Sequence, residues 1–188
     1  MCRIIKHGLI LCRKKGICRW KIFCPASTYF HKLYGNQDNL TYFDNVQWNG
    51  RKPRIKSDYV NVVLDIGYTM LFNIVDAMLQ VYGFDTYYGV FHKCFYMRKS
   101  LVCDIMEPIR PIIDYEVRKA INLGQCKIDD FEKYNERWCL KYKNNPQYIQ
   151  FLMQAIMEYK DEIFMYIQNY YRYFMKMKSV SEFPQFNI

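Results

Sequence analysis

The clearest hydrophobic pattern in the chain lies between Ser57 and Tyr82, where apolar residues fill most positions and polar residues recur every three or four. At about 100° per residue, the polar positions fall in one stripe roughly 120° wide. This stripe consists of Asp58, Asn61, Asp65, Thr69, Asn73, Asp76 and Gln80. Ser57 is suited to cap such a helix and Gly83 to end it. A helix that is apolar on most sides belongs at the centre of a bundle, so its polar stripe should face solvent or a polar cleft.

A second helical pattern begins at Ser100 and ends at Leu123, just before Gly124. Its faces separate into an apolar side (Leu101, Val102, Ile105, Met106, Ile109, Ile112, Ile113) and a polar side (Asp104, Glu107, Arg110, Asp114). Pro108 has no N–H to donate to the carbonyl of Asp104, four residues earlier. We therefore expect the helix to loosen at this proline.

The segments after the first pattern also favour helices. Gly83–Lys93 should be a loop with a short helical turn, and Asp129–Lys143 should be helical. Pro146 should begin a long helix that reaches about Lys178, because proline is favoured in the first turn. The aromatic run from Tyr166 to Phe174 lies in that helix. Such rings can stack on bases, but at helical spacing they more often form core.

The chain before Ser57 divides into two parts. Residues 1–24 hold four cysteines and indicate an atypical, basic, Cys-rich leader that is unstructured or spurious. The alternative is a basic arm or a metal knuckle. Residues 25–188 then form one helical domain, which begins with a short helix over Ala26–Tyr34 and a loop or small hairpin over Asn36–Pro53. The predicted fold class is all-α, a helical bundle without a β domain.

Composition narrows the class of protein. Hydrophobic residues make up 51% of the 188 residues and aromatic residues 18%, so the chain is not disordered by composition. No run of about 18 apolar residues occurs, so no membrane-spanning helix is expected. The apolar run Gly8–Cys12 is too short for a signal peptide. We therefore expect a cytoplasmic protein with reduced cysteines.

The net charge of +9 suggests a nucleic-acid partner, but it is unevenly distributed. Residues 1–24 carry seven Lys or Arg and no acid, which leaves 20 basic against 18 acidic residues, or +2, for the rest. Any affinity of the body for DNA must therefore come from a local basic patch.

Candidate chemistry gathers around the second helix. Asp104 and Glu107 are three residues apart, so their carboxylates project from adjacent turns of one face, beside the defect at Pro108. His92 lies in the preceding loop. One imidazole with two carboxylates suits Mg²⁺ or Mn²⁺. The alternative is that these residues form an ordinary solvated face. Nearby cations that could contact phosphate groups are Arg98, Lys99 and Arg110.

Three segments, Leu64–Leu71, Tyr82–His92 and Arg98–Pro111, together resemble the CRISPR-associated endonuclease that integrates new spacers. That family shows an Asn-Tyr-Gly-Tyr helix, a Gly-x-Asp-Pro turn, Gly-Phe-Leu-His, and Ser-Leu-x-x-Asp-Leu-x-Glu-Pro-Phe-Arg-Pro. The matching segments, in order and spacing over about 65 residues, are Leu64-Asp65-Ile66-Gly67-Tyr68-Thr69-Met70-Leu71, Tyr82–His92 and Arg98–Pro111. The first and the Arg98-Lys99-Ser100 junction resemble the versions that accompany type V effectors.

The resemblance implies roles for individual residues. His92 and Glu107 match two of the family's three metal ligands, and Asp104 matches the acid that precedes the second on the helix. The third ligand is a glutamate in a Glu-Gly-x-x-Ala-x-x-Tyr-Phe motif. Its end matches Ala26–Phe30, but its glutamate and glycine fall on Ile22 and Phe23. This ligand and the family's N-terminal β domain, which mediates dimer formation, are therefore expected to be absent.

The resemblance also implies a function and partners. The family joins the 3′-hydroxyl of a short double-stranded DNA (the prespacer) to the CRISPR repeat, with Mg²⁺ or Mn²⁺ as cofactor. It works as a homodimer with a small dimeric adaptation subunit. We expect this chain to be an incomplete form of such a metal-dependent DNA endonuclease or integrase, with little or no activity. The alternative is an inactive DNA-binding remnant of the same fold.

Overall fold

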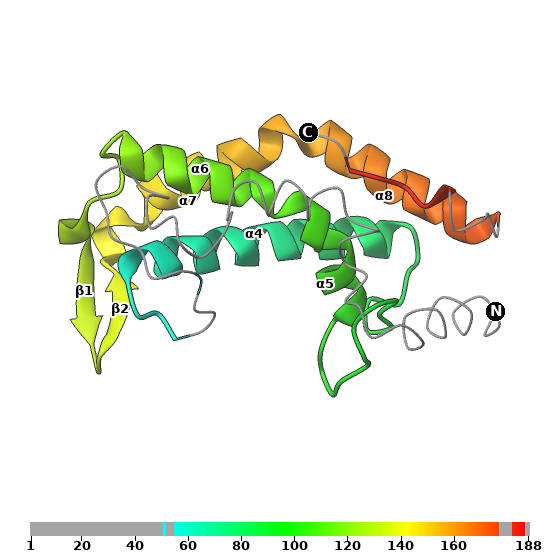
Figure 1. Ribbon diagram of the computed structural model, residues 1–188, viewed down its shortest axis with the longest axis horizontal. Coiled ribbons are helices and arrows are strands. Elements are labelled where there is room, and N and C mark those ends of the chain that lie inside the picture. The colour runs from blue at the N-terminus through cyan, green and yellow to red at the C-terminus, as the bar shows by residue number, and fades with distance from the viewer. Residues whose placement is uncertain (1–50, 52–54, 177–181, 187–188) are drawn as a thin grey trace, which may run out of the picture. The chain divides into compact units, whose positions relative to one another are not determined.

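The computed structural model describes residues 51, 55–176 and 182–186. These residues are mostly helical (Figure 1). The elements are α4 (Tyr59–Val81), α5 (Ser100–Met106), the 3₁₀ turn η1 (Glu107–Ile109), α6 (Pro111–Asn122), η2 (Ile128–Asp130), β1 (Phe131–Tyr134), β2 (Arg137–Leu140), η3 (Tyr142–Asn144), α7 (Asn145–Glu158) and α8 (Lys160–Met175). The expectations for residues 1–24, for the helix Ala26–Tyr34 and for nearly all of Asn36–Pro53 lie outside the described residues.

The chain folds as two compact units. The described part of the first unit comprises residues 72–109, 160–176 and 182–186, and that of the second comprises Arg51, 55–71 and 110–159. Helix α4 contributes its first half to the second unit and its second half to the first.

Helix α4 confirms the first predicted helix but not its predicted cap. The backbone N–H of Asn61 donates to Asp58 Oδ1 at 2.8 Å, so Asp58 caps the helix. Ser57 instead donates its hydroxyl to Asp58 Oδ2 at 2.9 Å. At the other end Gly83 has φ of 74° and donates to the carbonyl of Gln80 at 2.9 Å, which is the predicted glycine stop.

By length and composition α4 is apolar enough to cross a membrane, with a mean hydropathy of 1.6 over its most apolar stretch. In the structure, however, 44% of that stretch is buried within the protein. Val63, Leu71, Val75 and Leu79 are fully buried. This burial is that of a core helix, as its pattern predicts.

The core of the second unit forms where α4, α6 and α7 meet. Gly67 of α4 lies so close to its neighbours that a Cβ there would stand 2.5 Å from Ile113 Cγ2 and 3.2 Å from Leu152 Cδ2. Ile113 and Leu152 are themselves completely buried. The predicted packing of the first pattern against the second is therefore confirmed within this unit.

The second predicted helix is interrupted at its proline. It consists of α5, the 3₁₀ turn Glu107–Ile109 that contains Pro108, and α6, which starts at Pro111. The expected loosening at Pro108 is thus confirmed, since proline cannot donate the helical hydrogen bond.

The helix predicted over Asp129–Lys143 is wrong: this segment is an antiparallel hairpin of β1 and β2, the one sheet among the described residues. Asn135 and Glu136 form its two-residue turn, with φ of 46° and 63°. Turns with two positive φ values match the twist of hairpin strands. Phe131 anchors the hairpin because its ring packs 5.5 Å from the rings of both Tyr59 and Tyr148. Strands of four residues are too short to show a clear alternation in sequence.

The long helix predicted from Pro146 to about Lys178 is two helices. Tyr159, with φ of −106° and ψ of 16°, separates α7 from α8. In α8, Tyr166, Ile167 and Tyr170 are buried. The aromatic run is therefore largely core, as helical spacing favours.

We expect Gly67→Ala to lower the free energy of unfolding by about 1–3 kcal/mol, because the added methyl group would overpack the contact with Ile113. Helix propensity alone predicts the opposite effect, because alanine in place of glycine within a helix raises the free energy of unfolding by about 1 kcal/mol. Urea unfolding of both proteins measures the difference. A more stable variant would show that α4 and α6 are not packed this closely.

Candidate functional site

The candidate site is organised by the carboxylate of Asp104, which projects from α5 of the first unit and is 1% exposed. Oδ2 accepts the backbone N–H of Val90 at 2.6 Å and that of Phe91 at 2.9 Å. Oδ1 accepts the N–H of His92 at 3.1 Å and a hydrogen bond from His92 Nδ1. A buried carboxylate requires such donors, because its charge is otherwise uncompensated. The loop before α5 is thereby wrapped around one acid.

The local sequence allows this wrapping. A Cβ at Gly89 would lie 2.7 Å from Ser100 Cβ and 2.9 Å from Asp104 Oδ2, so only glycine fits there without displacement. The loop is also tied to the start of α5, because Leu101 N–H donates to Thr86 O at 3.0 Å and Ser100 Oγ to Lys93 O at 3.3 Å.

The contact with Asp104 determines which nitrogen of His92 is available. An ionised carboxylate can only accept, so Nδ1 carries a hydrogen, and in the neutral ring Nε2 is then the nitrogen with the lone pair. The His92 side chain is 23% exposed. A carboxylate behind an imidazole is the usual arrangement that orients a metal-binding histidine. This geometry suits Asp104 to orient the imidazole of His92; the assignment of Asp104 as a catalytic residue remains a prediction.

Glu107, the second predicted ligand, is the first residue of η1 and is half-buried. Within the part of the chain that the structure describes, no three His, Cys, Asp or Glu side chains are grouped so that they could hold a metal ion. Two of the three predicted residues, His92 and Asp104, are in contact. The assignment of His92 and Glu107 as metal ligands remains a prediction.

The three cations predicted to bind DNA differ in their surroundings. Lys99 Nζ donates to Asp76 Oδ2 at 2.6 Å. Burial alone would raise the pKa of Asp76, but hydrogen bonds from Lys99, Gln80 and Thr86 hold it below its usual value. Arg98 is exposed beside Lys99. Lys99 is thus committed to an ion pair, and Arg98 is better placed to meet a phosphate.

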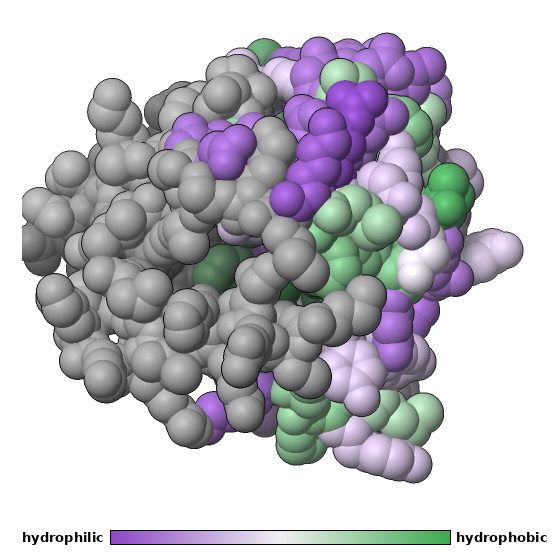
Figure 2. All heavy atoms as spheres, turned by 90° about the vertical axis from the view of Figure 1, so that its right-hand side faces the viewer, coloured by the Kyte–Doolittle hydropathy of each residue, from purple (hydrophilic) through white to green (hydrophobic). Residues whose placement is uncertain are grey.

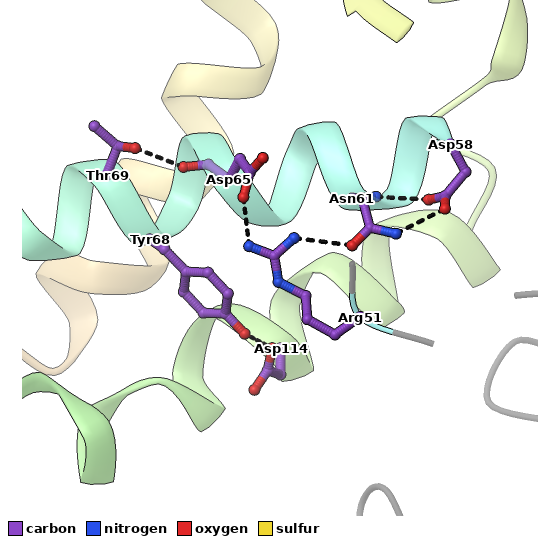
Figure 3. A network of polar contacts seen from close by, with 7 residues as sticks. All are labelled: Arg51, Asp58, Asn61, Asp65, Tyr68, Thr69 and Asp114. Atoms are coloured by element: carbon purple, nitrogen blue, oxygen red, sulfur yellow. Dashed lines mark hydrogen bonds and ion pairs between the residues drawn. The ribbon is translucent and has the colours of Figure 1, made fainter. Parts of the chain in front are cut away.

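Arg110 lies beside a polar network in the second unit that the sequence did not predict; Figure 3 shows members of this network, among them Arg51, Tyr68 and Asp114. The guanidinium of Arg110 lies 5.3 Å from the centre of the Tyr68 ring, and that of Arg51 lies 5.2 Å from the same ring. Tyr68 donates its hydroxyl to Asp114. Arg51 also pairs with Asp65 and donates to Asn61 Oδ1 at 2.8 Å. The polar stripe of α4 therefore faces an internal network at this end of the helix.

Exposed rings near His92 also escaped the sequence analysis. Tyr88, Phe95 and Tyr96 are 69%, 73% and 85% exposed, close to Arg98 in sequence. Exposed rings beside cations can stack on unpaired bases. On the side of the molecule where α8 ends, apolar and polar side chains lie next to one another in the described part of the surface (Figure 2).

Comparison with known families and proteins places these residues in context. The family described as CRISPR associated protein Cas1 matches residues 26–154, which is more than half of the chain. A CRISPR-associated endonuclease Cas1 of Thermus thermophilus is 34% identical over 145 residues, which are 68% of this chain and 44% of that protein. Another, of Archaeoglobus fulgidus, is 32% identical over 111 residues, 55% of this chain and 32% of the relative. The chain thus spans less than half the length of these relatives.

Solved structures are similar in fold. A Cas1 protein of Thermotoga maritima has a TM-score of 0.67 at 16% identity, with 92% of this chain and 63% of that chain covered. A Cas6-RT-Cas1–Cas2 complex has a TM-score of 0.71 at 22% identity, covering 97% of this chain and 23% of the other.

We expect Asp104→Asn to lower the free energy of unfolding by about 1–3 kcal/mol, because the buried donors of the loop lose their charged acceptor. The same change should weaken Mn²⁺ binding about 10- to 100-fold if His92 is a ligand. Urea unfolding and calorimetric Mn²⁺ titration measure the two effects. Asp85→Asn is the matched control, since Asp85 is exposed and accepts one N–H, from Tyr87. Equal effects of the two substitutions would contradict a special role for Asp104.

Proposed function

Because this chain belongs to the CRISPR-associated Cas1 family, we propose that it provides the helical, metal- and DNA-binding part of a CRISPR adaptation integrase, a nuclease of antiviral defence. The observation that carries the proposal is the orientation of His92 by the buried Asp104 within the family's motif. A neutral imidazole fixed in this way presents Nε2 to a metal ion.

The proposed cofactor is Mg²⁺ or Mn²⁺, held by His92 Nε2 and the carboxylate of Glu107. These donors are of the right kind for such ions, although they supply only two protein ligands among the described residues. When bound, the ion stabilises negative charge on a phosphodiester during strand transfer. Asp104 keeps the proton on Nδ1 and the ring in place, and Arg98 contacts a neighbouring phosphate.

The proposed partners are double-stranded DNA, both prespacer and CRISPR repeat, a second copy of the integrase chain, and the small dimeric adaptation subunit. Among the similar structures, a complex of Cas1 with Cas2 supports the last of these. We also propose that the protein works in the cytoplasm.

The second candidate function is an inactive DNA-binding remnant. It is favoured because the family's third metal ligand is a glutamate, and Ile22 occupies the matching position in this chain. Mg²⁺ prefers several hard oxygen ligands in strict geometry, so loss of one carboxylate weakens the site. We therefore propose that the chain alone has little activity.

We expect the purified chain to nick or integrate DNA with Mn²⁺ far more slowly than a full-length Cas1 protein. Replacing Ile22 by Glu together with Phe23 by Gly should raise the rate at least about tenfold, because it restores a ligand. Adding His92→Ala to that variant should remove the gain. Rates of unmodified chain comparable to the full-length protein would exclude the remnant and the need for a third ligand.

We expect Arg98→Glu to weaken binding to a short DNA duplex and to reduce the slope of log affinity against log salt by about one, because one phosphate contact is lost. Arg137→Glu is the control, since Arg137 is the exposed first residue of β2 and its substitution changes the net charge equally. Arg110→Glu should act mainly through the Tyr68 network and lower stability. Equal losses of affinity for the variants at positions 98 and 137 would show that only net charge matters.

A further inference from the structure

The segment 182–186 runs back along α8 and is attached to the first unit by two aromatic side chains (Figure 1). The ring of Phe183 lies 5.3 Å from that of Tyr173 and 5.9 Å from that of Tyr170. The ring of Phe186, which is buried, lies 5.6 Å from that of Tyr166. Tyr166, Tyr170 and Tyr173 all lie on α8, so aromatic contacts attach the segment to this helix.

A hollow of about 360 Å³ lies beside these contacts, lined on α8 by Asn169 and Arg172 and on the segment by Pro184 and Gln185. Among the described contacts, the two phenylalanines rather than the intervening residues therefore hold the segment in place.

Phe183 also reaches the candidate site. Its ring lies 6.3 Å from that of Phe91, edge to face, and Phe91 directly precedes His92. The N–H of Phe91 is one of the donors to Asp104. A contact that holds the Phe91 ring therefore restrains the backbone that wraps the Asp104 carboxylate.

The second partner of Phe183 leads to the same carboxylate. Burial and then the negative charge of Asp104 raise the pKa of Tyr170, so this phenol lies within the field of Asp104. Phe183 thus packs on Phe91, which directly precedes His92, and on Tyr170, whose pKa is raised in part by the charge of Asp104. Two ring contacts, with Phe91 and with Tyr170, therefore link Phe183 to the surroundings of the His92–Asp104 pair.

We propose that Phe183 is a positioning residue for His92: its ring, wedged between Phe91 and α8, holds the loop 90–92 on Asp104 and so keeps the His92 imidazole oriented. This inference rests on the proposed function only in taking His92 as a metal ligand. The C-terminal segment is in this view part of the site, although it contributes no ligand.

Hydrogen exchange of the backbone amides of Val90, Phe91 and His92 tests the proposal in the full chain. Phe183→Ala should speed their exchange about 3- to 10-fold, since one edge-to-face contact is lost. Phe183→Tyr, which keeps the ring, should restore slow exchange. Phe164→Ala is the matched control, because Phe164 is on α8 and packs against Tyr82 instead. Amides in the middle of α4, which are hydrogen-bonded within the helix, serve as the reference for global opening.

Three results would overturn the proposal. They are unchanged exchange of residues 90–92 in Phe183→Ala, an equal increase in Phe164→Ala, and an equal increase in the α4 amides of Phe183→Ala. Mn²⁺ titration of the same variants separates this inference from the proposed function. Weaker Mn²⁺ binding in Phe183→Ala, with rescue by Phe183→Tyr, supports both. If unmodified chain binds no Mn²⁺, the metal function fails, and the exchange of residues 90–92 still decides whether Phe183 positions the loop.

Discussion

The burial of one negative charge governs the first unit. The Asp104 carboxylate is almost completely removed from solvent, and burying a charge is strongly unfavourable unless donors surround it. The three consecutive N–H groups of residues 90–92 and the imidazole of His92 meet this requirement. The path of the loop, the glycine at position 89 and the tautomer of His92 all follow from it. The feature that makes the site suitable for a metal ligand is thus also the one that makes the loop fold.

In the second unit, the corresponding constraint is the environment of Tyr68. The guanidinium groups of Arg51 and Arg110 lie 5.2 and 5.3 Å from the centre of its ring, and its hydroxyl donates to Asp114, which is 1% exposed. Cation–π contacts and a charge-assisted hydrogen bond reinforce each other here. Tyr68 and Arg110 both belong to the family's motif. Part of that motif therefore serves to build the core, and a match to it does not by itself identify residues that act on DNA.

The sequence predicted those features that depend on long patterns or on single restrictive residues. The 23-residue α4 shows its polar stripe, Gly83 stops it, and Pro108 interrupts the second helix, because each has a strong local cause. The hairpin of β1 and β2 was missed, since four-residue strands carry little pattern and Phe131 is fixed by Tyr59 and Tyr148, far away in sequence. His92 and Asp104 were identified as candidates, but their roles require the orientation of Nδ1, which no spacing reveals. Phe183 carries no motif, and only its contact with Phe91 shows its relevance.

Most of the excess positive charge of the chain lies in residues 1–24. The body of the chain has a net charge of only +2 outside residues 1–24. Lys99 is paired with Asp76, and Arg110 lies against Tyr68, so two of its candidate cations already serve the fold. Electrostatic attraction to phosphate scales with the number of cations that can release counterions. Net charge therefore gives little support to DNA binding. That proposal depends on family membership and on the exposed Arg98, six residues after His92 in the chain. A basic protein is in this instance not evidence of a basic DNA-binding surface.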